Sequence, residues 1–257
     1  MNIVLSTKSK VKQLVTIFSN LKRIVDNVML IMDTDRLYIQ EMNDTHACLV
    51  EVCLKSTWFD TFECDEHEKL GVNCHLLFKI IDCWKEGQTI QFSIKKNEDN
   101  LHINFEGENT ISKAFVMPLM MLEHSPVTIP ERDYNVDFAL KSSVFKELIA
   151  EHEIFSDNLN INCHDTHIII EANGDSGKMQ TIIKENDIEE MSIEENSKIC
   201  AGYKTNYVSH VCSFSKLNDC IYIHMSLNSP LKMHYSLDDK DSFESMNYVR
   251  FYIAPVI

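Results

Sequence analysis

The chain has 257 residues, of which 44% are hydrophobic and 25% are charged, and its net charge is −15. This balance is typical of a globular protein with enough core for one large domain or two ordinary ones. It excludes a membrane-spanning class, because no apolar run approaches about 18 residues. The negative net charge argues against nucleic-acid binding over the whole surface. Binding would require the basic residues to be concentrated in one region.

The first predicted helix occupies residues 12–21, where apolar side chains recur at three- and four-residue spacing. The wider segment, residues 8–23, contains five basic residues and no acid. Alternating strands are expected over residues 28–54, a second apolar helix at residues 73–85 and a hairpin at residues 89–106. The first half therefore combines many strands with two helices.

Residues 117–133 are predicted to form an extended connector, because Pro118, Pro126 and Pro130 disfavour helix there. A connector of this length in a globular chain is usually functional. It is also apolar for a linker, so we expect it to lie against the body of the protein.

The second half repeats this order with an offset of about 131 residues. A helix is expected at residues 142–152, with Ser142 or Ser143 as its N-cap, and another at residues 204–214. Strands are expected between and after these helices. We therefore expect an N-terminal domain at residues 1–116, the connector at residues 117–133 and a C-terminal domain at residues 134–257.

The four helical segments carry a charge opposite to that of the whole chain. Their charges sum to +8, which leaves −23 for the other residues. If the helices share one surface, that surface attracts phosphate while the rest repels it. Four separately solvated helix faces are the alternative.

The sequence contains none of the catalytic motifs that we searched for. The chain contains no G-x-S-x-G, no phosphate-binding loop and no H-E-x-x-H. The nine Cys residues include no C-x-x-C pair and lie mostly in apolar runs, which indicates reduced core thiols rather than a metal site. We expect no catalytic residue, no metal and no cofactor.

Several strings resemble the proliferating cell nuclear antigen family. They are LYIQEMNDTHACLVEVCL at 37–54, FDTFECD at 59–65, LGVNCHLLFKII at 70–81, IPERDY at 129–134 and RFYIAPVI at 250–257. The similarity runs from Val11 to Ile257 in one order and at nearly constant spacing. Agreement of five separate strings makes the resemblance specific.

The resemblance implies an α+β fold of two similar domains, each built of two βαβββ units. Three subunits would close head to tail into a six-domain ring, with the helices lining the hole. Such a DNA sliding clamp encircles duplex DNA without reading its sequence, and it acts as a polymerase processivity factor. It is a docking platform for replication and repair proteins that carry a short motif ending in two aromatic residues. It is not an enzyme, needs a clamp loader, and works in the nucleus or in the replication compartment of a virus-infected cell.

The resemblance also implies three groups of site residues. The DNA-binding residues would be Lys8, Lys10, Lys12, Lys22, Lys79, Lys146, Lys204 and Lys216. The residues that bind partner peptides would be Met42, Leu49, Val127, Ile129, Pro130, Tyr134, Pro230, Tyr252, Ile253 and Pro255. Edge strands at residues 110–116 and 178–184 would form the subunit interface through Ile111, Lys113, Phe115, Met179, Thr181, Ile182 and Ile183.

Departures from the family keep alternatives open. Gln13, Ser19, Asp82 and Pro118 stand where relatives often carry Lys or Arg, so the hole would be less basic than usual. The chain could instead be a checkpoint-type subunit of a hetero-ring, or a viral clamp-like processivity or transcription factor that closes no homotrimer. A hydrolase with a novel site is the alternative from a different class.

Overall fold

The structure is a computed structural model that describes residues 1–64, 66–95, 98–123, 126–130, 132–194, 198–238 and 243–256. Ile257, the last residue of the closing string, lies outside these ranges. The chain divides into two α+β units. The first contains Met1–Glu41, Glu51–Val127 and Met246–Tyr248, and the second contains Met42–Val50, Thr128–Ser245 and Val249–Ile257.

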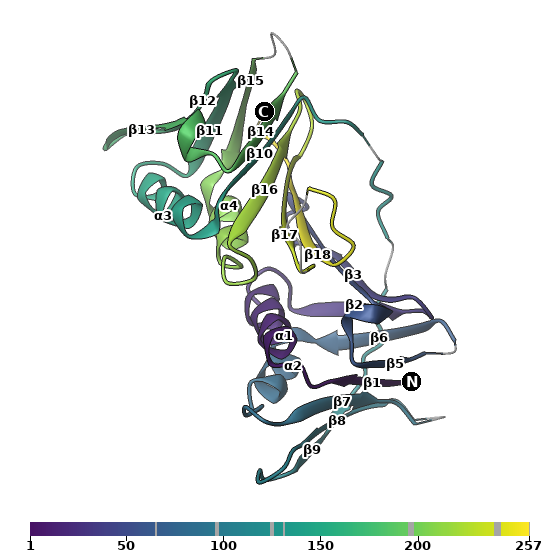
Figure 1. The fold of residues 1–257 in the computed structure, drawn as a ribbon. Helices are drawn as coiled ribbons and strands as arrows, with labels where there is room; N and C mark the ends of the chain where they lie inside the picture. Colours follow the sequence, from purple (N-terminus) through teal and green to yellow (C-terminus); the bar gives the residue numbers. More distant parts are fainter. Residues whose placement is uncertain are drawn as a thin grey trace. The chain divides into compact units, whose positions relative to one another are not determined.

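The first half of the chain builds an antiparallel sheet and a helix pair (Figure 1). Its elements are β1 (Asn2–Leu5), α1 (Lys8–Leu21), β2 (Asn27–Met32), β3 (Arg36–Met42), β4 (Cys48–Lys55), η1 (Ser56–Trp58), β5 (Thr61–Glu63), β6 (Glu68–Asn73), α2 (Cys74–Ile81), β7 (Thr89–Ser93), β8 (Asn100–Glu106) and β9 (Lys113–Pro118). The five-stranded sheet has the order β5-β1-β7-β8-β9. In addition, β2 pairs with β3 and β6, and α1 packs against α2.

The second half repeats this construction. Its elements are β10 (Val136–Lys141), α3 (Ser142–Glu153), β11 (Asn158–His164), β12 (His167–Gly174), β13 (Gly177–Lys184), η2 (Glu185–Asp187), β14 (Glu190–Ile193), β15 (Ile199–Lys204), α4 (Thr205–Cys212), β16 (Cys220–Met225), β17 (Leu231–Ser236) and β18 (Tyr248–Ile253). One sheet has the order β13-β12-β11-β15, and in a second one β10 lies between β14 and β16, with β17 next to β16. Helices α3 and α4 pack side by side.

Alternation of apolar side chains explains the second unit's strands. On β11, Leu159, Ile161 and Cys163 are fully buried, and the residues between them are not. A strand points successive side chains to opposite faces, so this period of two buries one face against a helix. On β17, which belongs to the other sheet, the buried Tyr235 donates a hydrogen bond from its hydroxyl to the Val211 carbonyl of α4 at 3.1 Å.

The predicted start of one helix and the predicted N-cap of another were wrong. Helix α1 begins at Lys8, four residues before the predicted start at Lys12. Helix α3 begins at Ser142 itself, and its N-cap is Lys141, which caps nothing with its side chain. The Ser142 N–H already donates to the Asp219 carbonyl at 2.7 Å, so this serine is a helical residue and not a cap.

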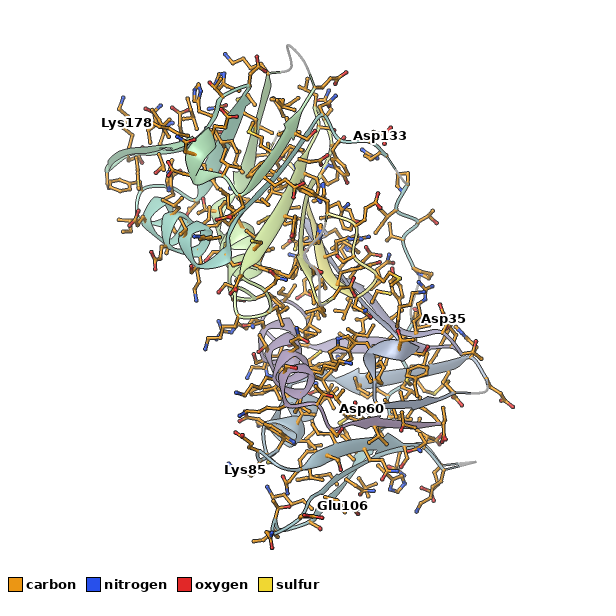
Figure 2. All side chains as sticks on the ribbon, viewed as in Figure 1. Asp35, Asp60, Lys85, Glu106, Asp133 and Lys178 are labelled. Carbon is orange, nitrogen blue, oxygen red and sulfur yellow. The ribbon has the colours of Figure 1, made fainter. Side chains whose placement is uncertain are left out.

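The two strands predicted as sheet edges are terminal strands. Within the described residues, β9 pairs only with β8, and β13 pairs only with β12. Figure 2 shows Lys178 on β13 at this free edge. The predicted start of the first edge strand was wrong, because the Thr110 N–H and hydroxyl both donate to the Gly107 carbonyl and form a turn. Ile111 therefore lies before β9.

The predicted connector is held to the first unit at two points. Near its start, the Met120 N–H donates to the Gly71 carbonyl of β6 at 2.8 Å. At residue 127, the Val127 N–H donates to Gln40 Oε1 at 2.7 Å, and Gln40 Nε2 donates to the Val127 carbonyl at 2.9 Å. The described residues 121–123 and 126–130 are neither helix nor strand. The described part of the connector, which we call the strap, therefore contains no helix, while the domain boundaries drawn from sequence stay a prediction.

Close approach of the strap requires glycine at position 71. A Cβ there would lie 2.2 Å from the Met120 carbonyl oxygen. We predict that Gly71→Ala lowers the free energy of unfolding by about 1–3 kcal/mol, because the added methyl group forces the backbone of β6 and that of Met120 apart. Urea unfolding measures this. Thr57→Ala, an exposed change in the same unit, is the control, and equal stability of the two variants would contradict the close approach.

Candidate functional site

Helix α1 and its C-cap carry four of the lysines predicted to contact DNA, and neighbouring groups contact three of them. Lys8 forms an ion pair with Glu86. Lys10 Nζ lies over the Trp58 ring at 5.9 Å, and Lys22 Nζ lies over the Phe78 ring of α2 at 3.6 Å. Lys12 on α1 and Lys79 on α2 are exposed. The first unit therefore presents a basic helix pair whose charges are partly compensated.

Glu86 was missed by the sequence-based charge sum. The predicted second helical segment ended at Lys85, so the charge of the next residue, Glu86, was not counted. In the structure, the Lys8 ammonium donates to the Glu86 carboxylate and holds its pKa below its ordinary value, with a smaller contribution from Lys12. The helix face of the first unit is therefore less positive than predicted.

The second unit also carries an acid that the charge sum left out. Lys146, Lys204 and Lys216 are exposed on or beside α3 and α4. Glu153 is the last residue of α3, one residue beyond the predicted helix, and it accepts a hydrogen bond from Ser209 of α4 at 3.1 Å. The net charge of the two helices is therefore lower by one than the sequence-based sum.

The N-terminus of α1 is tied to a residue far away in sequence. The Asp60 carboxylate accepts four hydrogen bonds of 2.5–3.1 Å from the N–H groups and hydroxyls of Ser6 and Thr7. Partial burial raises the pKa of Asp60, but these hydrogen bonds outweigh it and hold the pKa below its ordinary value. Asp60 thus fixes where the basic helix starts.

A groove with both apolar and polar lining lies beside β13, and its polar residues include Lys141, Asp187 and Glu189. It has a volume of about 380 Å³ and lies between β13 and the start of α3. Its lining includes Val144 and Leu148 of α3 and Thr181, Ile182 and Ile183 of β13. Ile182 is 54% exposed, while Ile183 is only 6% exposed. Of the two isoleucines predicted at the interface, Ile182 is therefore the one that faces outward.

The free edge of β9 also exposes apolar side chains. Val116 is exposed on the strand, and Ile111 just before it is 83% exposed. Phe115 packs against Phe105 of β8, with ring centroids 5.4 Å apart. Large exposed aliphatic groups beside unpaired backbone are unusual on a soluble protein and indicate a contact surface.

The residues predicted to bind peptides differ in accessibility. In the second unit, Ile129, Tyr134, Tyr252 and Pro255 are half-buried, and Pro130 and Pro230 are exposed. Met42 is half-buried, and in the first unit Val127 is exposed. Leu49 is buried, and Ile253 has no accessible surface, so direct contact of Ile253 with a peptide does not fit this structure. Ile253 alternates with Tyr252 on β18 and points into the core.

Six of the nine thiols are buried, while Cys83 and Cys220 are half-buried and Cys200 is exposed. Burial raises the pKa of Cys48 and of Cys74 to about 12, so both are protonated at neutral pH. Among the residues that the structure describes, no group of three or more His, Cys, Asp or Glu side chains could hold a metal ion. In the same residues, no helix is long and apolar enough to cross a membrane.

The comparisons with known proteins cover nearly the whole chain. Residues 3–126 match the family model described as proliferating cell nuclear antigen, N-terminal domain. Residues 128–256 match the model described as proliferating cell nuclear antigen, C-terminal domain. The chain is also 24% identical over 238 residues to proliferating cell nuclear antigen 2 of Drosophila melanogaster, covering 92% of this chain and 91% of that protein.

We predict that Asp60→Ala lowers the free energy of unfolding by about 1–2 kcal/mol at pH 7, because the start of α1 loses its acceptor. The folded-state pKa lies below the ordinary 3.8, so this stabilisation is complete above that pH and is lost as pH falls through the folded-state pKa. Thermal unfolding between pH 7 and pH 2 measures it. Asp44→Ala, on an exposed turn, is the control, and a difference that persists undiminished at pH 2 would contradict the role of the ionised carboxylate.

Proposed function

Because the chain belongs to the proliferating cell nuclear antigen family, to which both of its halves match, we propose that this sliding clamp closes a homotrimeric ring around duplex DNA. In that ring it acts as a polymerase processivity factor and as a docking platform for replication and repair proteins. The observation that carries the proposal is the pair of free, partly apolar sheet edges, β9 and β13, that this two-domain chain presents.

Ring closure is supported by the chemistry of the two edges. Each edge strand leaves backbone N–H and C=O groups unpaired on one side, which favours addition of another strand. Pairing β9 of one subunit with β13 of the next is a head-to-tail contact, and it repeats until rotation closes it. The groove beside Ile182 would receive apolar side chains from the β9 edge, such as Val116.

DNA would be held by the ring rather than by strong electrostatic attraction. The lysines predicted to contact DNA would touch phosphates loosely and read no bases. Glu86 and Glu153 lower the positive charge of the helix faces. The proposal therefore assigns retention on DNA to topology, and it requires a clamp loader to open the ring.

Partner proteins would dock on the surface formed by the end of the connector and the C-terminal strand. Tyr134, Ile129 and Tyr252 would contact a short helical turn whose two aromatic side chains insert into the surface. Such a clamp catalyses no reaction, takes no cofactor and works in the nucleus or in a viral replication compartment.

We predict that the purified chain is a trimer of about three times its 29.8 kDa mass. Ile182→Glu should shift it to monomer at micromolar concentration, because a charge would be buried at the edge. Light scattering coupled to size exclusion measures this, and Leu227→Glu, exposed at the β16–β17 turn, is the control. A wild-type monomer would contradict the homotrimer and would favour the checkpoint-type hetero-ring or the viral clamp-like factor.

We predict that Ile129→Ala and Tyr252→Ala each lower the affinity for a peptide ending in two aromatic residues roughly ten- to thirtyfold, because each removes an apolar contact. Both variants should remain trimers. Fluorescence anisotropy with a labelled peptide measures the affinity, and Leu76→Ala on α2, also partly exposed, should leave it unchanged. Unaltered affinity in both variants would place the docking surface elsewhere.

A further inference from the structure

Three adjacent strands of the second unit place an acid and two histidines on one face. Asp137 of β10 lies directly opposite His224 of β16, and Tyr222 lies opposite His234 of β17. Because side chains alternate along strands, these four side chains share a face. It is the face away from α4, since Tyr235, the neighbour of His234, points to that helix.

Hydrogen bonds link the three polar groups in a chain. His224 Nδ1 lies 2.5 Å from Asp137 Oδ1, and His224 Nε2 lies 3.1 Å from His234 Nδ1. The carboxylate only accepts, so His224 donates from Nδ1. In its neutral form His224 then accepts at Nε2, and His234 must donate from its own Nδ1. The resting network therefore runs from His234 through His224 to Asp137.

The network is enclosed by aromatic rings. The His224 side chain is only 5% exposed, and the His234 ring is fully buried and stacks on Tyr222, with ring centroids 4.9 Å apart. Phe243 lies 5.6 Å from the His224 ring. Tyr134, at the end of the connector, has its ring centroid 5.2 Å from that of His224. The His224 ring therefore lies directly against the Tyr134 ring.

The connector's end is anchored to the hairpin that carries both histidines. Arg132 Nη1 donates to Ser229 Oγ at 2.7 Å, and the Asn135 N–H donates to Ser226 Oγ at 3.1 Å. Between these anchors, the Tyr134 ring lies against His224 on one side and near Lys232 Nζ, at 5.3 Å. These two hydrogen bonds hold the chain on both sides of Tyr134 and so keep its ring over the His224 ring.

Adding a proton changes this network. Burial lowers the pKa of His224 below its ordinary value, Asp137 opposes this, and Lys232 and Arg250 act in the same direction as burial. A proton on Nε2 would make His224 a donor toward His234, which already donates toward it. One ring must then turn or exchange its tautomer. The new charge also repels Lys232, which lies near the Tyr134 ring.

We propose that the Asp137–His224–His234 network is a protonation switch that controls the position of Tyr134 and so the affinity for partner peptides. The switch rests on the proposed docking function, because Tyr134 belongs to the proposed peptide surface. The neutral network holds Tyr134 in the binding arrangement. Protonation at mildly acidic pH rearranges the histidine pair, displaces Lys232 and releases Tyr134.

The test compares peptide affinity at pH 7.5 and pH 5.5, using a labelled histidine-free peptide that ends in two aromatics. Wild type should bind about fivefold or more weakly at pH 5.5. His224→Gln can still donate to Asp137 but cannot gain a charge, so its affinity should change less than twofold. His164→Gln, a histidine of the same unit outside the network, should behave as wild type. Affinity of wild type that is independent of pH, or equal pH dependence in His224→Gln, would overturn the switch.

A second measurement separates the switch from the docking function. The Tyr134 ring resonance of the wild-type trimer, followed by NMR with 13C-labelled tyrosine, should titrate together with the His224 ring. Failure of the two to titrate together overturns the switch, even where peptide binds. If the two rings titrate together but no peptide binds at either pH, the control of Tyr134 by the histidine network is supported. The proposed docking surface is then refuted.

Discussion

The interaction on which the proposed assembly depends is backbone hydrogen bonding at two of the sheet edges that the described residues form, β9 and β13. Strand β9 ends the sheet of the first unit, and β13 ends one sheet of the second. Hydrogen-bonding groups on a free edge favour addition of a further strand, and aliphatic side chains such as Val116 and Ile182 beside them favour burial. Because β9 lies in the first unit and β13 in the second, these two edges are suited to head-to-tail assembly, and the family to which the chain belongs forms sliding clamps.

Much of this fold could be predicted from local pattern. The apolar periodicity of residues 12–21 and the alternation on β11 each depend on neighbouring side chains, so one sequence reveals them. The start of α1 depends instead on Asp60, which is distant in sequence. Ser142 has the composition of an N-cap, but its N–H is bound by Asp219, so tertiary structure overrides that preference.

The candidate surfaces were predicted less completely, for the same reason. Glu86 and Glu153 each stand one residue outside a helical window, and only their contacts with Lys8 and Ser209 reveal their effect on the helix charge. Ile253 belongs to the closing string that resembles the family. Side chains alternate along β18, however, and that of Ile253 points into the core. The histidine pair comes from two strands and its acid from a third, so no spacing in the sequence could have brought them together.

The central claim is a closed ring that holds DNA by topology, and retention on circular against linear DNA tests it most directly. The protein is loaded by an ATP-driven clamp loader onto nicked circular DNA, washed in high salt, and followed before and after the circle is linearised. The account predicts that the protein stays on the circle in salt that removes ordinary phosphate-binding proteins, and slides off the linear form. Equal loss from both forms would contradict a closed ring.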